Sequence, residues 1–453
     1  MRNFIFATLI GIIALPAGAA EVTYTKDIAA ILWKHCADCH RPGAVAPFSL
    51  LTYKDAAKRA EFLHEVTANR EMPPWKPEPG HGEFHGARRL TDQELDLLAA
   101  WAKGGAKEGD QRDLPPAPTF PKEDIWRLGT PDVVLTLPQP FSVPASGPDI
   151  YRCFVIPTQI VEDKMVSAVE FRPGNRRVVH HALLFLDNLR QARAKEAAHA
   201  KKEVDSQPGY PVYGGLGGIL PTGDLGAWTP GITPRFLPAD VGMPLKKGAD
   251  VVLQIHYHPS GKDETDQSTL AIYFNKNAKA KSILGIPLVN FNLCIPAGAE
   301  RHRVTASFTL PADVDVVAIQ PHMHTLGREV KVRAVLPDGA QQPLIWIRDW
   351  NFNWQDRYLY KEFVPLPRGT RLECEAFYDN SEKNPQNPNQ PPREVRWGEA
   401  TTEEMLLCPV YVVANRTEDY ARLLLRTVTI PGLIQTWYLE QGGESVRQAD
   451  LRK

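Results

Sequence analysis

Residues 251–274 read VVLQIHYHPSGKDETDQSTLAIYF, and this stretch decides the fold class. Two apolar runs, Val251 to Tyr257 and Ser268 to Phe274, flank a segment rich in Pro, Gly and Asp, which is typical of antiparallel strands joined by a turn. Similar runs occur at Val166 to Phe171, Val178 to Leu186, Val314 to Ile319 and Glu329 to Val335. The chain from Ile125 onward is therefore predicted to form antiparallel β-sandwiches.

This β-type region holds about 330 residues, which is too many for one sandwich, so we expect two in tandem. A short internal sequence similarity places the boundary between them. Cys153 to Pro157 and Cys294 to Pro296 each precede a pair of strands that carries histidines. The expected domains are residues 125–285 and 286–453. Residues 188–203, rich in Ala, Lys, Arg and Glu, predict an exposed helical insertion.

The first 110 residues predict a small all-α domain over residues 21–110. One helix is expected before residue 36 and a second over residues 53–68. A third begins at the capping box Thr91-Asp92-Gln93-Glu94 and ends at Gly104-Gly105. Residues 111–124 follow as a Pro-rich linker.

Inside this helical domain lies the motif Cys36-Ala37-Asp38-Cys39-His40. C-x-x-C-H is the attachment motif of c-type haem, in which both cysteines form thioethers to the haem and the histidine ligates the iron. Cys36, Cys39 and His40 are therefore the expected haem-binding residues, and the domain predicts a cytochrome c with one covalent haem.

The sixth haem ligand is expected at Met72, in the non-helical loop that the two following prolines impose. A thioether is the soft ligand that raises the haem potential in electron-transfer cytochromes. If Met72 only packs in the core, His64, His81 or His85 is the alternative ligand.

Residues 1–20 predict a secretory signal peptide, with a charged start, an apolar run and a cleavage site after Ala19 or Ala20. No later stretch approaches the roughly 20 apolar residues that a membrane-spanning helix needs. We therefore expect a periplasmic protein without a transmembrane segment once the signal is removed. The formal net charge of −1 gives no reason to expect nucleic acid as a partner.

The β region contains three pairs of histidines: His180-His181, His256-Tyr257-His258 and His322-Met323-His324. Alternate side chains share a face of a strand, so His322 and His324 can hold one metal ion while Met323 points away. The second pair has the same spacing, and one or both of its histidines could be ligands.

Ligation of one metal ion by both adjacent histidines requires a particular backbone geometry. His180 and His181 would face opposite sides of a regular strand, so joint ligation needs a β-bulge or different ring nitrogens reaching one ion. Taken alone, each pair is more often a set of satisfied core histidines than a metal site. Three pairs in one chain with a haem motif favour metal binding.

The softness of the donors favours copper. A site of two imidazoles and the thioether of Met405 suits Cu(I) better than zinc, which takes thiolate, imidazole or carboxylate. A blue-copper site is not expected, because Cys408 lacks the downstream His and Met that would complete it.

From about Trp126 to Val413 the chain resembles the copper type II, ascorbate-dependent monooxygenases, the family of peptidylglycine α-hydroxylating and dopamine β-monooxygenases. Four stretches carry the resemblance in order: Val178-Val179-His180-His181-Ala182-Leu183-Leu184-Phe185, Leu253-Gln254-Ile255-His256-Tyr257, His322-Met323-His324-Thr325-Leu326-Gly327 and Thr402-Glu403-Glu404-Met405.

The resemblance implies two tandem jelly-roll-like domains with one copper ion each, facing each other across a wet cleft. By position, the electron-transferring copper would be held by His180, His181 and His256. The copper that binds oxygen and substrate would be held by the catalytic residues His322, His324 and Met405. His258 has no counterpart among the family ligands.

The implied reaction is hydroxylation of a C–H bond of a small organic substrate by O₂. The family draws its electrons from ascorbate, whereas the fused haem here predicts a built-in path from haem to the three-histidine copper and then to the methionine copper, fed by a periplasmic donor. Family members that bind peptides have an arginine at the position of Gln320. An amide cannot replace the guanidinium fork, so a peptide ending in glycine is not expected as the substrate.

Two other functions compete with this one. The first is a non-enzymatic haem and copper protein for electron transfer or copper handling, and the second is a partner-binding scaffold that carries a cytochrome. For the remaining cysteines, the resemblance implies a disulfide between Cys374 and Cys408. Cys153 with Cys294 then follows only by elimination, and residue spacing alone leaves all three pairings open.

Overall fold

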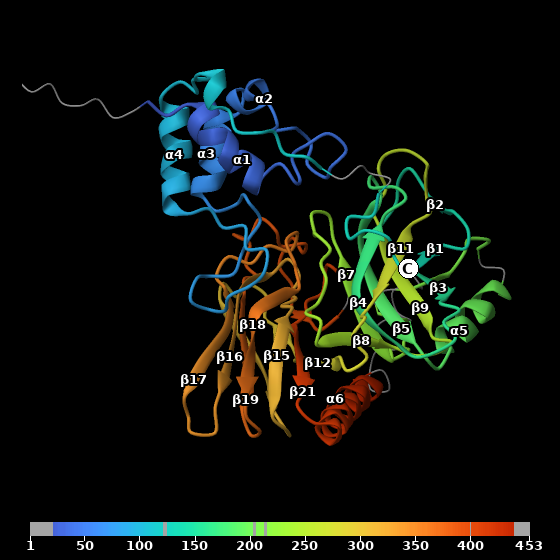
Figure 1. Ribbon diagram of the computed structural model, residues 1–453. Coiled ribbons are helices and arrows are strands. Elements are labelled where there is room, and N and C mark those ends of the chain that lie inside the picture. The colour runs from blue at the N-terminus through green and yellow to red at the C-terminus, as the bar shows by residue number, and fades with distance from the viewer. Residues whose placement is uncertain (1–20, 121–124, 203–204, 213–214, 399, 439–453) are drawn as a thin grey trace, which may run out of the picture. The chain divides into compact units, whose positions relative to one another are not determined.

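The computed structural model describes residues 21–120, 125–202, 205–212, 215–398 and 400–438 (Figure 1). The expected signal peptide lies outside these residues. Contacts divide the chain into a helical unit, Met1–Pro73 with Arg89–Thr119, and a β unit, Pro74–Arg88 with Phe120–Lys453.

The helical unit consists of short helices around one small core. Its elements are η1 (Tyr24–Ile28), α1 (Ala29–His35), α2 (Tyr53–Ala57), α3 (Ala60–Ala68), α4 (Asp92–Lys103) and η2 (Gln111–Asp113). Ile28, Leu32, Leu98 and Trp101 are buried between them because apolar side chains recur at helical spacing. The predicted all-α character of this region is confirmed.

The ends of α4 follow the sequence signals. Thr91 and Glu94 form both hydrogen bonds of the capping box, and the helix ends before Gly104 and Gly105. The helix expected over residues 53–68 is instead two helices. Arg59 donates its guanidinium to the carbonyl of Asp55, while its own N–H turns to the carbonyl of Ala56, so the α-helical ladder is broken there.

Residues 74–88 leave the helical unit and pack in the β unit, although they fall inside the haem domain expected over residues 21–110. The backbone N–H of Glu78 donates to Trp346 and that of His85 donates to Leu359, both at 2.8 Å. Phe84 lies in the core of the second sandwich. This arm is therefore held by backbone pairing and by burial of an aromatic side chain.

In its described residues the β unit has three large sheets and two small ones. The five-stranded sheet has the order β6 (Tyr210–Pro211), β3 (Ile150–Pro157), β9 (Asp250–Tyr257), β5 (Val179–Asp187) and β7 (Gly223–Trp228). The four-stranded sheet has the order β14 (His302–Thr309), β19 (Arg371–Tyr378), β16 (Gly327–Val335) and β17 (Gln341–Ile347). The small sheets pair β10 (Glu264–Asp266) with β2 (Phe141–Val143), and β13 (Cys294–Ile295) with β20 (Val395–Arg396).

An eight-stranded sheet runs through both halves of the unit. Its order is β1 (Val133–Thr136), β11 (Thr269–Phe274), β4 (Lys164–Arg172), β8 (Val241–Leu245), β12 (Lys281–Val289), β21 (Leu407–Ala414), β15 (Val314–Ile319) and β18 (Tyr358–Leu366). Two residue pairs join β8 to β12 in parallel, and the other pairings are antiparallel. The expected boundary at residue 285 falls inside β12.

Two separate cores make this unit a pair of sandwiches. One core lies between the five-stranded sheet and β1, β11, β4 and β8, and the other lies between the four-stranded sheet and β12, β21, β15 and β18. All six strand runs named from the sequence are confirmed. So is the helical insertion, as α5 (Gln191–Ala200).

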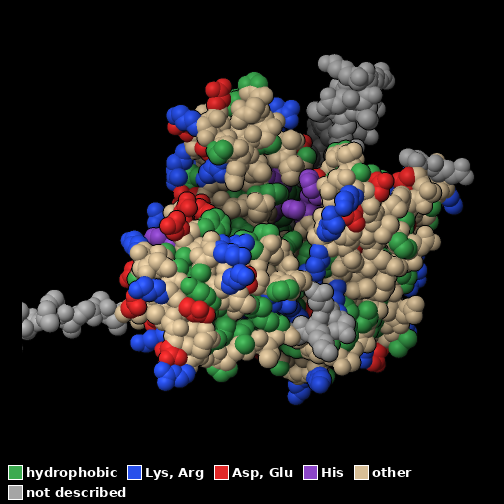
Figure 2. Space-filling model, turned by 90° about the horizontal axis from the view of Figure 1, so that it is seen from above, with side chains coloured by type: hydrophobic (Ala, Val, Ile, Leu, Met, Phe, Trp, Pro, Cys, Tyr) green, Lys and Arg blue, Asp and Glu red, His purple; other side chains and the backbone are tan. Residues whose placement is uncertain are grey.

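A last helix, α6 (Thr417–Tyr438), contacts β12 and β21. None of the helices in the described part of the chain has the length and apolar character that crossing a bilayer demands. On the face drawn in Figure 2, Lys and Arg side chains are interspersed with Asp and Glu, in keeping with the near-zero net charge.

Candidate metal centres

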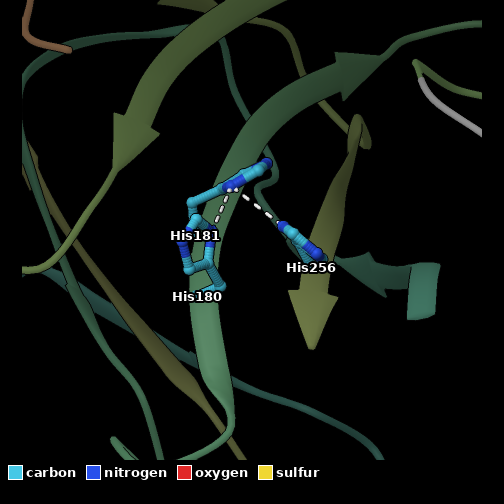
Figure 3. Close-up of side chains that lie close together, drawn as sticks. All are labelled: His180, His181 and His256. Carbon is cyan, nitrogen blue, oxygen red and sulfur yellow. Dashed lines mark hydrogen bonds between the residues drawn. The ribbon is translucent and has the colours of Figure 1, made fainter. Parts of the chain in front are cut away.

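The three-histidine cluster, His180, His181 and His256, forms where β5 pairs with β9 in the first sandwich. Val179 faces Tyr257 and His181 faces His256, so one residue of β5 is left over between them. This register shift is the bulge that the adjacent histidine pair requires. It turns His180 and His181 toward the same point, next to His256 (Figure 3).

The three Nδ1 atoms converge in this cluster. Nδ1 of His181 lies 3.2 Å from Nδ1 of His180 and 3.3 Å from Nδ1 of His256. One ligand atom from each residue falls within 4.8 Å of the others. Three ring nitrogens that face one point can all offer lone pairs to a metal ion when the protons are on the outer nitrogens, which is the arrangement of a metal site with imidazole ligands.

His256 is the most constrained ring of the three. It is 3% exposed and stacks on Tyr151, with ring centroids 4.2 Å apart and planes at 11°. Its Nε2 lies 2.8 Å from a carboxylate oxygen of Asp149, whose other oxygen lies 2.7 Å from Nδ1 of His258. A carboxylate on the outer nitrogen is the usual support of a metal-bound histidine.

Burial keeps these imidazoles neutral. It lowers the pKa of His256 to about 4, with a further contribution from His180. It lowers the pKa of His181 well below its usual value, and the neighbouring histidines, including His322 and His324, lower it further. The rings are therefore unprotonated at neutral pH, which is the form that binds a metal ion.

The second candidate site begins just beyond the end of β15. His322 and Leu407 form an isolated antiparallel bridge, which ties the H-x-H segment to the start of β21. Met323 is buried in the core of the second sandwich, so the predicted alternation holds although these residues lie past the strand. The rings of His322 and His324 are 5.2 Å apart.

Each of these two rings has its Nδ1 engaged. Nδ1 of His322 lies 2.5 Å from the side-chain oxygen of Gln355, and Nδ1 of His324 lies 3.1 Å from the carbonyl oxygen of Glu403. Nε2 is therefore the nitrogen that each ring offers to a ligand. Met405, the third expected ligand, is buried two residues before Leu407.

Glu404 joins the two segments that carry these residues. Its side chain is fully buried, and its carboxylate accepts hydrogen bonds from the backbone N–H groups of His324, Leu326 at 3.0 Å and Met405 at 2.9 Å. Burial raises the pKa of Glu404 to about 8 against the opposing effect of these donors.

The haem motif follows α1 in the helical unit. Cys36 and Cys39 are both partly buried. Nδ1 of His40 lies 3.2 Å from the carbonyl oxygen of Phe48, and the two rings are 4.5 Å apart. A histidine whose Nδ1 is held by a backbone carbonyl presents Nε2, so these residues fit a covalent haem. Met72 is partly buried, and its role as sixth ligand stays a prediction.

A cavity of about 140 Å³ lies in the β unit, lined from both sandwiches. Its walls are mainly apolar and include Leu225, Leu237, Met243 and Val317. Gln355, which holds His322, also lines this cavity, so it adjoins the second candidate site.

The polar end of the cavity is built around Arg357. Its guanidinium donates to Asp224 and Tyr411, each at 2.7 Å, and to the side-chain oxygen of Gln320 at 3.1 Å. A guanidinium from a neighbouring segment thus reaches the position where the sequence has an amide. Residue 320 itself carries no guanidinium, as expected. Arg357 nevertheless places a guanidinium beside it.

No protein-family model matches the chain. The chain is similar to DBH-like monooxygenase protein 1 of Homo sapiens. The two are 25% identical over an alignment of 310 positions, which covers 63% of this chain and 47% of the human protein, so the chain spans about half the length of that relative. This distant similarity and the three-histidine cluster are consistent with a copper monooxygenase.

Two solved structures show a much weaker likeness. A structure of PNGF-II matches 62% of this chain and 65% of its own, with 9% identity and a TM-score of 0.29. A structure of infectious bursal disease virus, Gt strain, matches 65% and 75%, with 8% identity and a TM-score of 0.19. These TM-scores are too low to relate the folds.

The four cysteines outside the C-x-x-C-H motif differ in whether a second cysteine lies nearby. Cys374 of β19 and Cys408 of β21 lie in the same core, and their thiols are in hydrogen-bonding contact. Their disulfide, implied by the resemblance, stays a prediction. Cys153 donates its thiol to the carbonyl of Gly215 in the first sandwich, whereas Cys294 lies on β13 of the second. The structure thus does not bring together the pair suggested by elimination.

Sequence reasoning missed four residues that shape these sites: Asp149, Gln355, Glu404 and Arg357. Each of these residues either lies far along the sequence from the histidine it contacts or binds only backbone groups. The spacing of residues in the sequence therefore does not predict these contacts. Only Glu404 had a signal, because a charged residue next to the expected ligand Met405 is a candidate for burial beside the metal.

Proposed function

We propose that this protein is a periplasmic, copper-dependent monooxygenase that hydroxylates a C–H bond of a small organic substrate. The overall change is R–H + O₂ + 2e⁻ + 2H⁺ → R–OH + H₂O, so two electrons must come from a reductant. A c-type haem on Cys36, Cys39 and His40 would supply them, fed by a periplasmic donor. Two bound copper ions would bring the redox chemistry and the activation of O₂.

The observation that carries the proposal is the convergence of three Nδ1 atoms in the three-histidine cluster. Three neutral imidazoles suit copper in either oxidation state that electron transfer requires. His322, His324 and Met405 would hold the second ion, where a thioether favours the reduced form. The distant similarity to a human DBH-like monooxygenase supports the same reaction class.

The cavity beside His322 is the natural place for the substrate. Its apolar walls suit a hydrocarbon body, and its volume is about 140 Å³. Among the described residues Nη1 of Arg357 has no hydrogen-bond acceptor, so the polar end offers a donor to a substrate oxygen. Gln355 keeps Nε2 of His322 directed at the metal position.

The test begins with copper stoichiometry. Mature, haem-loaded protein is given copper and dialysed extensively, and copper per chain is compared between wild type and Met405→Ala. We expect two ions in the wild type and one in the variant. His199→Ala is the matched control and should keep two, because His199 lies on α5 and belongs to neither ligand set.

A second measurement separates an enzyme from a copper-handling protein. Haem re-oxidation and O₂ consumption are followed with and without candidate small amphiphilic substrates. Substrate-dependent O₂ consumption by the wild type, lost in Met405→Ala, supports the monooxygenase. Two tightly held copper ions without any substrate-dependent O₂ consumption would instead favour electron transfer or copper handling, and no tightly held copper would remove both.

A further inference from the structure

We infer that Asp149 and His258 are positioning residues that fix which ring nitrogen His256 presents to the metal of the three-histidine cluster. The identity of that metal as copper rests on the proposed function, whereas the choice of nitrogen is a property of the chain itself. The inference also assigns a role to His258, which the ligand sets leave without one.

The hydrogen-bond chemistry of Asp149 determines the tautomer of His256. A neutral imidazole carries its proton on one nitrogen and a lone pair on the other. An ionised carboxylate can only accept, so Nε2 of His256, at 2.8 Å from Asp149, must be the protonated atom. The lone pair is then on Nδ1, the atom that faces His181 at 3.3 Å.

His258 holds the carboxylate in the orientation that this requires. The two oxygens of Asp149 have separate partners, because Nδ1 of His258 lies 2.7 Å from one and Nε2 of His256 lies 2.8 Å from the other. The Asp149 side chain is 34% exposed, so without a second partner its carboxylate could rotate toward water. His258 itself is 68% exposed, which suits a tether and not a ligand inside the cluster.

The backbone makes this tether rigid. His258 directly follows β9, and its N–H donates to the carbonyl of Val178 at 2.8 Å, next to the bulge that orients the adjacent histidines. Tyr151 stacks on the ring of His256 and limits its rotation. The ring is thus held on its face by Tyr151 and at its outer nitrogen by Asp149, leaving only Nδ1 for a metal ion.

The test uses the full mature chain with ¹⁵N-labelled histidine in the metal-free and Cu(I)-loaded forms. Long-range ¹⁵N–¹H correlation identifies the protonated nitrogen of His256. Copper affinity of the cluster is measured by competition with a Cu(I) chelator in the Met405→Ala background, so that one site is observed. The variants are Asp149→Ala, Asp149→Asn and His258→Ala.

We expect wild-type His256 to be protonated on Nε2, and Asp149→Ala to give a mixture of tautomers with a loss of copper affinity of about 10- to 100-fold. Asp149→Asn should largely rescue both readouts, because its amide oxygen can still accept from His256 while its N–H₂ group faces His258. His258→Ala should produce a smaller loss of affinity than Asp149→Ala. His199→Ala, which removes the α5 histidine that lies 3.4 Å from Asp205, is the control and should change neither readout.

An Asp149→Ala protein that keeps His256 protonated on Nε2 and binds copper within about twofold of the control would overturn the inference, since loss of such a support ordinarily weakens binding by far more. A general loss of folding would lower affinity without the rescue by Asp149→Asn, and thermal unfolding of each variant identifies that case. If the wild type binds no copper, the proposed function fails, while the tautomer in the metal-free chain still decides the role of Asp149.

Discussion

The carboxylate of Glu404 accepts a hydrogen bond from the backbone N–H of Leu326 at 3.0 Å, across 78 residues of sequence. The same side chain accepts from His324 and Met405, so one buried carboxylate holds both ligand-bearing segments of the second candidate site. A fully buried acid with backbone donors on both oxygens cannot be exchanged for an amide without placing an N–H₂ group against an N–H group.

Glu404→Gln should therefore lower the free energy of unfolding by about 1–3 kcal/mol, which is the cost of leaving a buried hydrogen-bond donor without an acceptor. For a domain of this size that corresponds to a fall in Tm of about 2–12 °C. Scanning calorimetry measures it, with copper analysis showing selective loss of the ion at Met405. The exposed neighbour Glu403→Gln is the control. Equal Tm values for the two variants would contradict this account.

The metal-free protein should lose stability as the pH falls from about 6.5 toward 4. Burial holds the pKa of His256 at about 4, below the ordinary value near 6.5, so in this window the unfolded state binds more protons than the folded state. The stabilisation that neutral His256 provides is complete above pH 6.5. It falls by about 3 kcal/mol as the pH drops through the pKa that His256 has in the folded state.

Thermal unfolding of the metal-free protein between pH 4 and pH 7 measures this slope. His256→Gln removes the titrating group and should flatten the curve, while the same substitution at the exposed His85 should not. An unchanged slope in His256→Gln would show that other groups govern acid unfolding.

The network around Arg357 should couple the two sandwiches energetically. Asp224 lies on β7 of the first sandwich and Tyr411 on β21 of the second, and Arg357 donates to both. A double-mutant cycle with Arg357→Gln and Asp224→Asn should give a coupling of about 1–3 kcal/mol, as expected for contacting residues in one network.

The exposed pair Lys246 and Asp163, 2.7 Å apart, provides the comparison cycle. Water and salt screen a solvent-exposed ion pair, so this cycle should give the smaller value. A coupling at Arg357 no larger than that of the exposed pair would mean that the network does not hold the sandwiches together.

Thiol titration of the denatured, unreduced protein should find two thiols per chain. The neighbouring Cys374 and Cys408 are expected to form a disulfide in an oxidising compartment, and Cys36 and Cys39 are expected to be bound to haem. Cys153 and Cys294, which the structure separates, should remain as the titrated pair. Four thiols would mean that Cys374 and Cys408 stay reduced.

Met72→Ala should change the absorption spectrum of the haem and lower its midpoint potential, because a thioether ligand raises that potential. Spectroelectrochemistry of the haem-loaded protein measures both. His64→Ala, His81→Ala and His85→Ala are the matched comparisons. If one of these substitutions, and not Met72→Ala, changes the spectrum and potential, that histidine is the sixth ligand.

Local spacing of residues was enough to predict the secondary-structure elements and the candidate ligands. Alternating apolar runs predict strands because side chains alternate between the two faces of a sheet, and the capping box at Thr91 predicts a helix start because it satisfies free N–H groups. The adjacent pair His180-His181 even specified the bulge that would make joint ligation feasible. These signals act over a few residues, so they can be read from spacing.

Tertiary structure alone decided what lies beside the ligands. The arm of residues 74–88 joins the β unit because Phe84 is buried in a core built from distant strands. Asp149 reaches His256 across 107 residues, and Arg357 supplies a guanidinium beside Gln320 from another segment. Such contacts depend on how separate strands are brought together in space, and the free energy of burying a charged group is settled only by those neighbours.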